Sequence, residues 1–143
     1  MKSINWGRVI LGGVVAGVVV NVSEFVLNEI VLKSKNEEAM KALGKTMPTG
    51  GSAMTVWILW GFAMGIVAVW LYAAIRPRYG AGPGTAVKAG VAVWILAYVF
   101  CTIALSNMGV FPLNAVAFVW VLAEAVLATV VGAWLYREEG AIA

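Results

Sequence analysis

Four long apolar stretches constrain what this chain can fold into. An α-helix needs about 20 mostly apolar residues to cross the roughly 30 Å hydrocarbon core of a bilayer. Because lipid offers no hydrogen-bond partners, the backbone groups of each stretch must be satisfied within a helix. The sequence therefore predicts one all-α membrane domain over residues 1–143, a four-transmembrane-helix bundle arranged as two helical hairpins. The expected spans cover residues 6–32, 54–75, 86–105 and 113–136.

The first span begins like a secretory signal peptide, with Lys2 and Arg8 near its start. Asn21, Ser23 and Glu24 follow its apolar run, and then more apolar residues, where a signal peptide would have a small-residue cleavage site. We therefore expect the first span to be retained as a membrane helix.

The composition supports a membrane location and disfavours several kinds of chemistry. Hydrophobic residues make up 62% of the chain and charged residues 12%, against about 45–50% and about 25% in an average soluble domain. All seven acidic residues are Glu, the sequence has no His, and Cys101 is its one cysteine. Histidine is the commonest general base and metal ligand, and disulfides need paired cysteines. We therefore expect a non-enzymatic protein without a metal or other cofactor.

Lysine and arginine are distributed unequally between the two ends of the expected spans. Six fall on one side, namely Lys2, Arg8, Arg76, Arg78, Lys88 and Arg137. Four lysines, between residues 33 and 45, fall on the other side. Because cytoplasmic loops are enriched in these residues, both termini are expected in the cytoplasm. Arg76 and Arg78 are expected to contact anionic lipid headgroups, and no feature indicates a nucleic-acid partner.

Aromatic residues gather near the ends of the expected spans. One interfacial belt is expected to contain Trp6, Trp70, Tyr72, Trp134 and Tyr136. Trp-Leu-Tyr occurs twice in this set, which indicates either a duplicated hairpin or two similar belt positions. We prefer the belt, because three residues are too few to establish a repeat.

A short amphipathic helix is expected over residues 36–44, between the first and second spans. Asn36 is a suitable N-cap, Glu37 and Glu38 complement the positive end of the helix dipole, and Gly44 suits the C′ position. Apolar residues at helical spacing form one face. The helix is therefore expected to lie flat on the outer surface, over the bundle or among the lipid headgroups.

Small and polar residues form a stripe along one face of the first span. Residues three or four apart share a helix face, and the stripe runs through Gly13, Gly17, Asn21, Glu24 and Asn28. Small residues let helices approach closely, and polar residues form hydrogen bonds across the contact.

Other spans carry similar stripes. The fourth has Glu124, Ala128 and Gly132, and the second has Gly61 and Gly65. We expect spans one and four to face each other through their stripes. At about 1.5 Å rise per residue, Asn21 and Glu124 reach similar depths and are expected to pair.

Asn21, Glu24, Asn28 and Glu124 form the expected intramembrane polar cluster. A carboxyl group at the bilayer centre costs roughly 2.5–3.5 kcal/mol, and the spans offer no buried lysine or arginine to offset Glu124. Three roles stay open for this cluster. It is a structural clasp between helices, a proton- or cation-coupled site, or a polar anchor for an amphipathic ligand such as a quinone, lipid or pigment.

Two segments, VWLYAAIRPRYGAGPGTA at residues 69–86 and AWLYRE at residues 133–138, resemble a family of small four-span bacterial membrane proteins of uncharacterised function. The resemblance implies a fold and a bacterial inner membrane, with no activity and no functional residues to carry over. Small multidrug transporters also have four spans and a Glu in the first. This chain lacks the rest of their pattern, and Glu24 lies far towards the outer end of its span.

The sequence favours a non-enzymatic accessory or scaffold subunit that packs through its small-residue faces. The first alternative is a small proton-coupled transporter that uses Glu124 and Glu24. The second is a binder of an amphipathic ligand between its helices. The expected partners are the lipid bilayer and either other membrane subunits or further copies of this chain.

Overall fold

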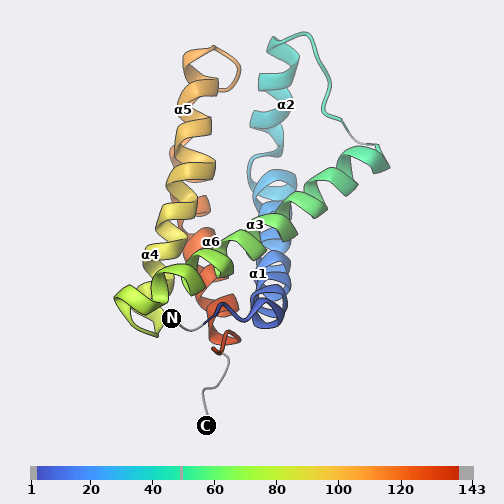
Figure 1. The fold of residues 1–143 in the computed structure, drawn as a ribbon. Coiled ribbons are helices and arrows are strands. Elements are labelled where there is room, and N and C mark those ends of the chain that lie inside the picture. The colour runs from blue at the N-terminus through green and yellow to red at the C-terminus, as the bar shows by residue number, and fades with distance from the viewer. Residues whose placement is uncertain (1–2, 49, 139–143) are drawn as a thin grey trace.

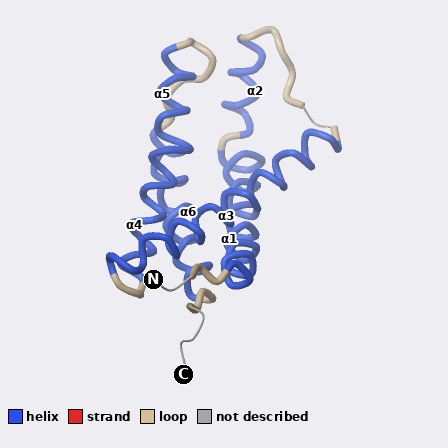
Figure 2. Tube along the Cα trace, in the orientation of Figure 1, coloured by secondary structure: helices blue, strands red, loops and turns tan. Residues whose placement is uncertain are grey.

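The computed structural model describes residues 3–48 and 50–138, and every regular element in these ranges is a helix (Figures 1 and 2). Within them, four helical segments are long and apolar enough to cross a membrane, and the first and third each contain a π-helical turn. The elements are α1 (Trp6–Val26) with the π-helical turn Leu27–Val31, α2 (Lys33–Ala42), α3 (Gly51–Tyr79), α4 (Pro83–Trp94) with the π-helical turn Ile95–Val99, α5 (Phe100–Asn107) and α6 (Ala115–Trp134).

Helix α3 is longer at both ends than the expected span of residues 54–75, and it stays helical past Pro77. The Thr85 hydroxyl stabilises its C-terminal end, where it lies 3.2 Å from the carbonyl oxygen of Tyr79 and 2.8 Å from that of Gly80. The carbonyl groups at the end of a helix receive no hydrogen bond from a backbone N–H of that helix. The Thr85 hydroxyl takes the place of these missing donors.

Helix α3 crosses α1 obliquely (Figure 1), and glycines on both helices allow a close approach. A methyl group at Gly65 would lie 2.8 Å from the Cα atom of Gly17, and one at Gly13 would lie 2.6 Å from that of Ile66. Both distances are too short for a real side-chain carbon. Gly61 continues the same contact, so the glycine stripes of spans one and two meet each other.

A second close contact joins α1 to α6 through Gly12 and Gly132. A methyl group at Gly132 would lie 2.7 Å from the carbonyl oxygen of Gly12 and 3.0 Å from the Cβ atom of Ala16. The face with Gly13 and Gly17, expected to meet α6, therefore meets α3 instead. Successive helix residues point about 100° apart, so neighbouring glycines serve two different contacts.

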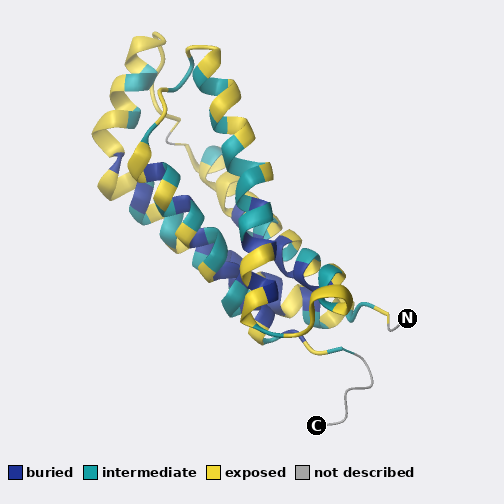
Figure 3. Cartoon of the chain, turned by 90° about the vertical axis from the view of Figure 1, so that its left-hand side faces the viewer, coloured by how far each residue is buried: buried dark blue, intermediate teal, exposed yellow. Residues whose placement is uncertain are grey.

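Buried residues concentrate where the four long helices pack together, and neither α2 nor α5 contains one (Figure 3). Helix α1 packs against α3 and α6, and α4 packs against α6 and α3. A methyl group at Gly90 of α4 would lie 2.8 Å from the Cα atom of Val126 of α6, so this contact is also close. Helices α2 and α5 project beyond the packed region.

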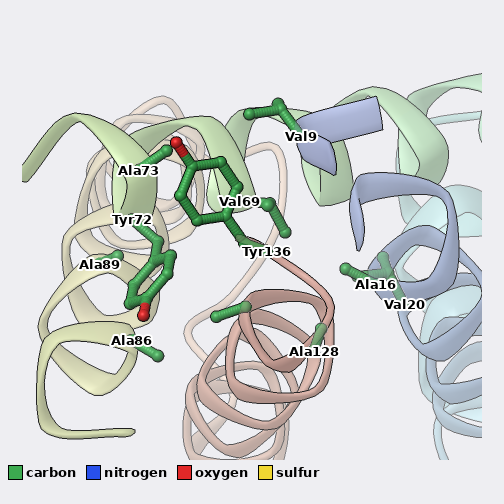
Figure 4. Close-up of a cluster of buried hydrophobic side chains, with 11 residues drawn as sticks. Val9, Ala16, Val20, Val69, Tyr72, Ala73, Ala86, Ala89, Ala128 and Tyr136 are labelled. Carbon is green, nitrogen blue, oxygen red and sulfur yellow. The ribbon is translucent and has the colours of Figure 1, made fainter. Parts of the chain in front are cut away.

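Tyr72 and Tyr136 belong to one cluster of buried hydrophobic side chains (Figure 4). Their rings meet edge to face, with centroids 5.9 Å apart. The Tyr72 hydroxyl accepts a hydrogen bond from the Gly82 N–H at 3.2 Å, and the Tyr136 hydroxyl accepts one from the Asn5 N–H at 3.3 Å. Both tyrosines therefore face the protein core, where these hydrogen bonds satisfy their hydroxyl groups, and their depth at the membrane interface stays a prediction.

The tryptophans of the expected belt are exposed, unlike its tyrosines. Trp6 is 58% exposed, Trp70 39% and Trp134 87%. On a helix, residues two apart point to nearly opposite sides. Each Trp-Leu-Tyr segment thus directs its tryptophan outward and its tyrosine towards the other segment.

Helix α2 differs from the flat amphipathic helix expected over residues 36–44. It begins at Lys33, because α1 continues towards it through the π-helical turn with Leu32 as the single residue between them. Asn36 therefore lies inside the helix and does not cap it. The helix extends beyond the end of α1 instead of lying across the bundle (Figures 1 and 3).

The C-terminal end of α2 has the expected glycine. Gly44 has a φ of +69°, a conformation that side chains with a Cβ atom rarely adopt. The Gly44 N–H donates to the Lys41 carbonyl at 2.9 Å, and the Lys45 N–H donates to the Met40 carbonyl at 3.0 Å. This pair of bonds is a Schellman motif.

We expect Gly65→Ala to destabilise the protein by about 1–3 kcal/mol, because the added methyl group overpacks the contact between α1 and α3. The measurement is SDS-induced unfolding of the detergent-solubilised protein, followed by circular dichroism. Gly84→Ala is the matched control, since a methyl group there meets no atom within 4 Å. Equal stability of the two variants would contradict the proposed role of the glycine contact.

Candidate functional site

The carboxyl groups of Glu24 on α1 and Glu124 on α6 lie against each other. Only 6% of Glu124 is exposed, and its carboxyl group interacts with the Glu24 carboxyl and the Ser23 hydroxyl. No lysine or arginine lines the cavities around this pair in the described part of the chain. Two adjacent carboxylates repel each other when no cation separates them. The contact between the two side chains therefore requires a proton on one of them.

Two asparagines extend this pair along the first helix. Asn28 Nδ2 donates to Glu24 Oε2 at 2.6 Å, and Asn36 Nδ2 donates to Asn28 Oδ1 at 3.1 Å. These bonds hold the Glu24 side chain towards α6 and tie α2 to the end of α1. A polar network therefore runs from α6 through α1 into α2.

A tryptophan of α6 supports the other side of the pair. Trp120 Nε1 donates a hydrogen bond to Ser23 Oγ at 2.9 Å. Ser23 also interacts with Glu124, so it connects the indole to the carboxyl group. This contact fixes α6 against α1 at the level of the two glutamates.

A cavity of about 50 Å³ lies beside the two carboxyl groups, and all four long helices contribute to its lining. Its polar lining groups include Glu24, Glu124, Trp94 and Tyr98, whereas most of its other residues are apolar. One water molecule needs about 10–15 Å³ of such space. The cavity is therefore large enough for several water molecules or a small ligand group.

Two buried polar atoms of the cavity lining have no hydrogen-bond partner within the described residues. They are Glu124 Oε2 and Trp94 Nε1. Native proteins leave few buried polar atoms unpaired, and each exception indicates a water molecule, a ligand or a functional group. The residues that line this cavity therefore include an acidic group and an N–H donor that no described residue satisfies.

Both π-helical turns lie next to this site. Asn28 belongs to the turn Leu27–Val31, and Tyr98 belongs to the turn Ile95–Val99 on the opposite helix. A π-helical turn inserts one extra residue into a helix and redirects the side chains that follow, and such turns are frequent at functional sites. Asn28 of the first turn bonds Glu24, and Tyr98 of the second turn lines the cavity.

Asn21 does not join the two carboxyl groups, although it was expected to pair with Glu124. Its Nδ2 donates to the Gly17 carbonyl at 2.9 Å and to the Ile58 carbonyl of α3 at 3.2 Å. The Asn21 side chain also fills the space in front of Gly61. Asn21 thus belongs to the contact between α1 and α3.

The remaining small residues predicted on α6 do lie near α1. Ala128 is buried and lines the central cavity, and Gly132 makes the close contact with Gly12. The stripe of α6 therefore runs from the site at Glu124 to the closest approach of the two helices.

Arg76 and Arg78, predicted to contact lipid headgroups, have different surroundings. Arg76 Nη1 lies 3.3 Å from Glu138 Oε1, and its guanidinium group lies 5.6 Å from the centre of the Tyr136 ring. The Arg78 side chain is exposed. The headgroup role stays a prediction for both, and Arg76 also joins α3 to the segment after α6.

Sequence reasoning did not include Ser23, Trp94, Tyr98 or Trp120 in the site. The spacing of Trp94 and Tyr98, four residues apart on one helix face, was the available signal. This spacing does not reveal which helix face points into the bundle, because aromatic residues are common on both lipid-facing and buried faces.

No group of three or more His, Cys, Asp or Glu side chains that could hold a metal ion occurs in the described residues. No protein-family model, curated protein or solved structure matches the chain significantly. The function therefore has to be inferred from the chemistry of the site, and the resemblance to small four-span bacterial proteins stays a prediction.

We expect Asn28→Ala to release α2 from α1, because it removes both the bond to Glu24 and the acceptor for Asn36. Amide hydrogen exchange within Lys33–Ala42 should accelerate, as followed by mass spectrometry. Asn21→Ala is the control, since its bonds go to Gly17 and Ile58. If exchange in α2 is the same in both variants, the asparagine network does not order this helix.

Proposed function

We propose that this chain is a multi-pass protein of a bacterial inner membrane and works as a small proton-coupled transporter. Its four long helices form a transmembrane bundle of two hairpins, and the pair of Glu24 and Glu124 binds the coupling proton. The observation that carries the proposal is that Glu124 lines a cavity together with Glu24 and has a buried oxygen, Oε2, that lacks a partner in the described residues.

The contact between the carboxyl groups supports a proton-binding role. With one proton, the protonated carboxyl can donate to the other, and the pair carries one negative charge in an apolar setting. Removing that proton changes the charge of the site by one unit, and a monovalent cation that replaces the proton restores the charge. A cation that enters the cavity can therefore compete with the proton for the same pair, which is the requirement for exchange.

A purely structural clasp fits the site less well. Buried polar networks that only stabilise a fold gain from having every member satisfied, because an unpaired buried group costs free energy. Asn28 and Ser23 meet this condition, whereas Glu124 Oε2 and Trp94 Nε1 do not. Both residues line the central cavity, which supports a site that admits another species.

The ends of the helices support an orientation with both termini in the cytoplasm. Arg76 pairs with Glu138, and the Asn5 N–H bonds the Tyr136 hydroxyl, so the Arg76 end of α3 lies on the same side as the first and last described residues. Arg8 and Arg78 also belong to this end, and positively charged residues favour the cytoplasmic side.

An accessory or scaffold role in a larger membrane complex or a homo-oligomer stays a second proposal. It is favoured by α5, where Phe100 is 59% and Ile103 is 52% exposed and no residue is buried. A neighbouring subunit could cover this apolar helix, and so could lipid. Proton coupling and assembly with other subunits are compatible.

We expect dicyclohexylcarbodiimide, which reacts with protonated carboxyl groups in apolar surroundings, to modify Glu24 or Glu124 of the protein in liposomes. Mass spectrometry locates the adduct. The exposed Glu37 and Glu38 serve as internal controls and should stay unmodified. Modification should fall as pH rises, because the reactive proton is then lost. Equal modification of all four residues, or none at Glu24 and Glu124, would rule out a proton-binding pair.

We expect Glu124→Gln to abolish proton-driven solute currents while leaving the melting temperature nearly unchanged, because the amide keeps the shape and hydrogen-bonding capacity of the side chain. Currents are recorded from proteoliposomes on a solid-supported membrane with a panel of amines, amino acids and sugars. Glu29→Gln is the control, since Glu29 is exposed and 3.7 Å from Lys33. The transporter proposal fails if the wild-type protein gives no proton-driven current with any solute.

A further inference from the structure

Glu124 borders a second space in addition to the central cavity. An open recess of about 710 Å³ lies on the outward face of α6, beside Ser23 of α1, and is called the lateral recess below. Its walls are mostly apolar and include the exposed side chains of Val119 and Leu127. Ligand sites for small molecules commonly occupy about 300–1,000 Å³.

The polar part of the lateral recess is concentrated at one place. Glu124, Ser23 and Trp120 line it together, and the bond from Trp120 to Ser23 holds two of them in position. Glu124 is the single charged residue among those that line the recess, and no lysine or arginine joins it in the described chain. The recess thus combines a carboxyl group and an indole ring with a long apolar wall.

We infer that the lateral recess binds an amphipathic organic amine, with its ammonium group at Glu124 and its apolar part along Val119 and Leu127. A carboxylate and an aromatic ring both attract an ammonium group, whereas an anionic head is repelled by the carboxylate and a neutral head gains no attraction between opposite charges and no cation–π contact. Because the recess lies on the outward face of α6, such a ligand reaches Glu124 from the side of the bundle. This inference rests on the proposed proton-binding role of Glu124 and names the substrate class.

Because Glu124 lies between the two spaces, the amine can exchange there with the proton that the carboxyl pair shares. The central cavity on one side holds Glu24, and the lateral recess on the other side holds the apolar part of the ligand. An ammonium group at Glu124 would supply the positive charge that the shared proton supplies in its absence. Binding of the amine and binding of the proton then exclude each other.

The test compares two photoreactive probes in phosphatidylcholine liposomes, a diazirine alkylamine and the diazirine alcohol of the same chain length. We expect the amine to label the segment of residues 115–127 roughly tenfold more than the alcohol, the factor that one charge-assisted hydrogen bond supplies. Glu124→Gln should remove this preference, and Glu29→Gln should retain it. Equal labelling by both probes in the wild-type protein, or a preference that survives Glu124→Gln, would overturn the inference.

A second variant separates this inference from the proposed function. Ala123 is exposed and lines the lateral recess without touching the central cavity, so Ala123→Trp fills the recess and spares the carboxyl pair. We expect amine labelling to be lost while carbodiimide still modifies Glu24 or Glu124. If amine labelling persists, the ligand does not bind in the recess, even though the proton-binding pair is intact. If carbodiimide does not modify Glu24 or Glu124 in the wild-type protein, the proposed proton-binding function itself is contradicted.

Discussion

The close contacts of α1 with two other helices set the geometry of the rest of the molecule. Gly13 and Gly17 let α3 cross on one face, and Gly12 lets α6 approach on the adjacent face. Without side chains at these positions, helix backbones come closer than ordinary packing allows, and van der Waals contact replaces the hydrophobic driving force that lipid does not provide. Because α3 crosses obliquely, helices that touch at the glycines separate further along (Figure 1). The central cavity adjoins one of these close contacts, because Gly65 is among the residues that line it.

The polar site lies along α1 and α6 at a distance from their closest contact. At about 1.5 Å per residue, Glu124 lies roughly 12 Å along α6 from the contact at Gly132, where α1 and α6 are no longer held by glycines. Hydrogen bonds take over there, from Trp120 to Ser23 and between Asn28 and Glu24. The interface between α1 and α6 thus changes along its length from backbone contact to polar side-chain contact. Both the central cavity and the lateral recess lie beside this polar end.

Apolar length was enough to predict four long helices, and glycine chemistry was enough to predict the end of α2 at Gly44. The sequence did not predict which helices pack against which face of α1. Neighbouring residues separate these faces, since Gly13 meets α3 and Gly12 meets α6. Nothing in the local sequence marked the π-helical turn Leu27–Val31, although it directs Asn36 to Asn28 and makes α2 a continuation of α1. The two Trp-Leu-Tyr segments led us to place all four aromatic residues in an interfacial belt. The sequence did not reveal that Tyr72 and Tyr136 are buried, because each packs against a residue that is distant in sequence.

The carboxyl groups of Glu24 and Glu124 differ in their hydrogen-bond partners, and this difference bears on their function. Asn28 binds Glu24 from the same helix, so Glu24 keeps a partner whatever enters the cavity. Glu124 has one oxygen unpaired in the described structure and borders both the central cavity and the lateral recess. A buried acidic atom without a partner costs free energy, and any species that supplies a proton or a positive charge to it lowers that cost. Glu24 is therefore suited to hold the geometry, and Glu124 is suited to exchange one bound cation for another.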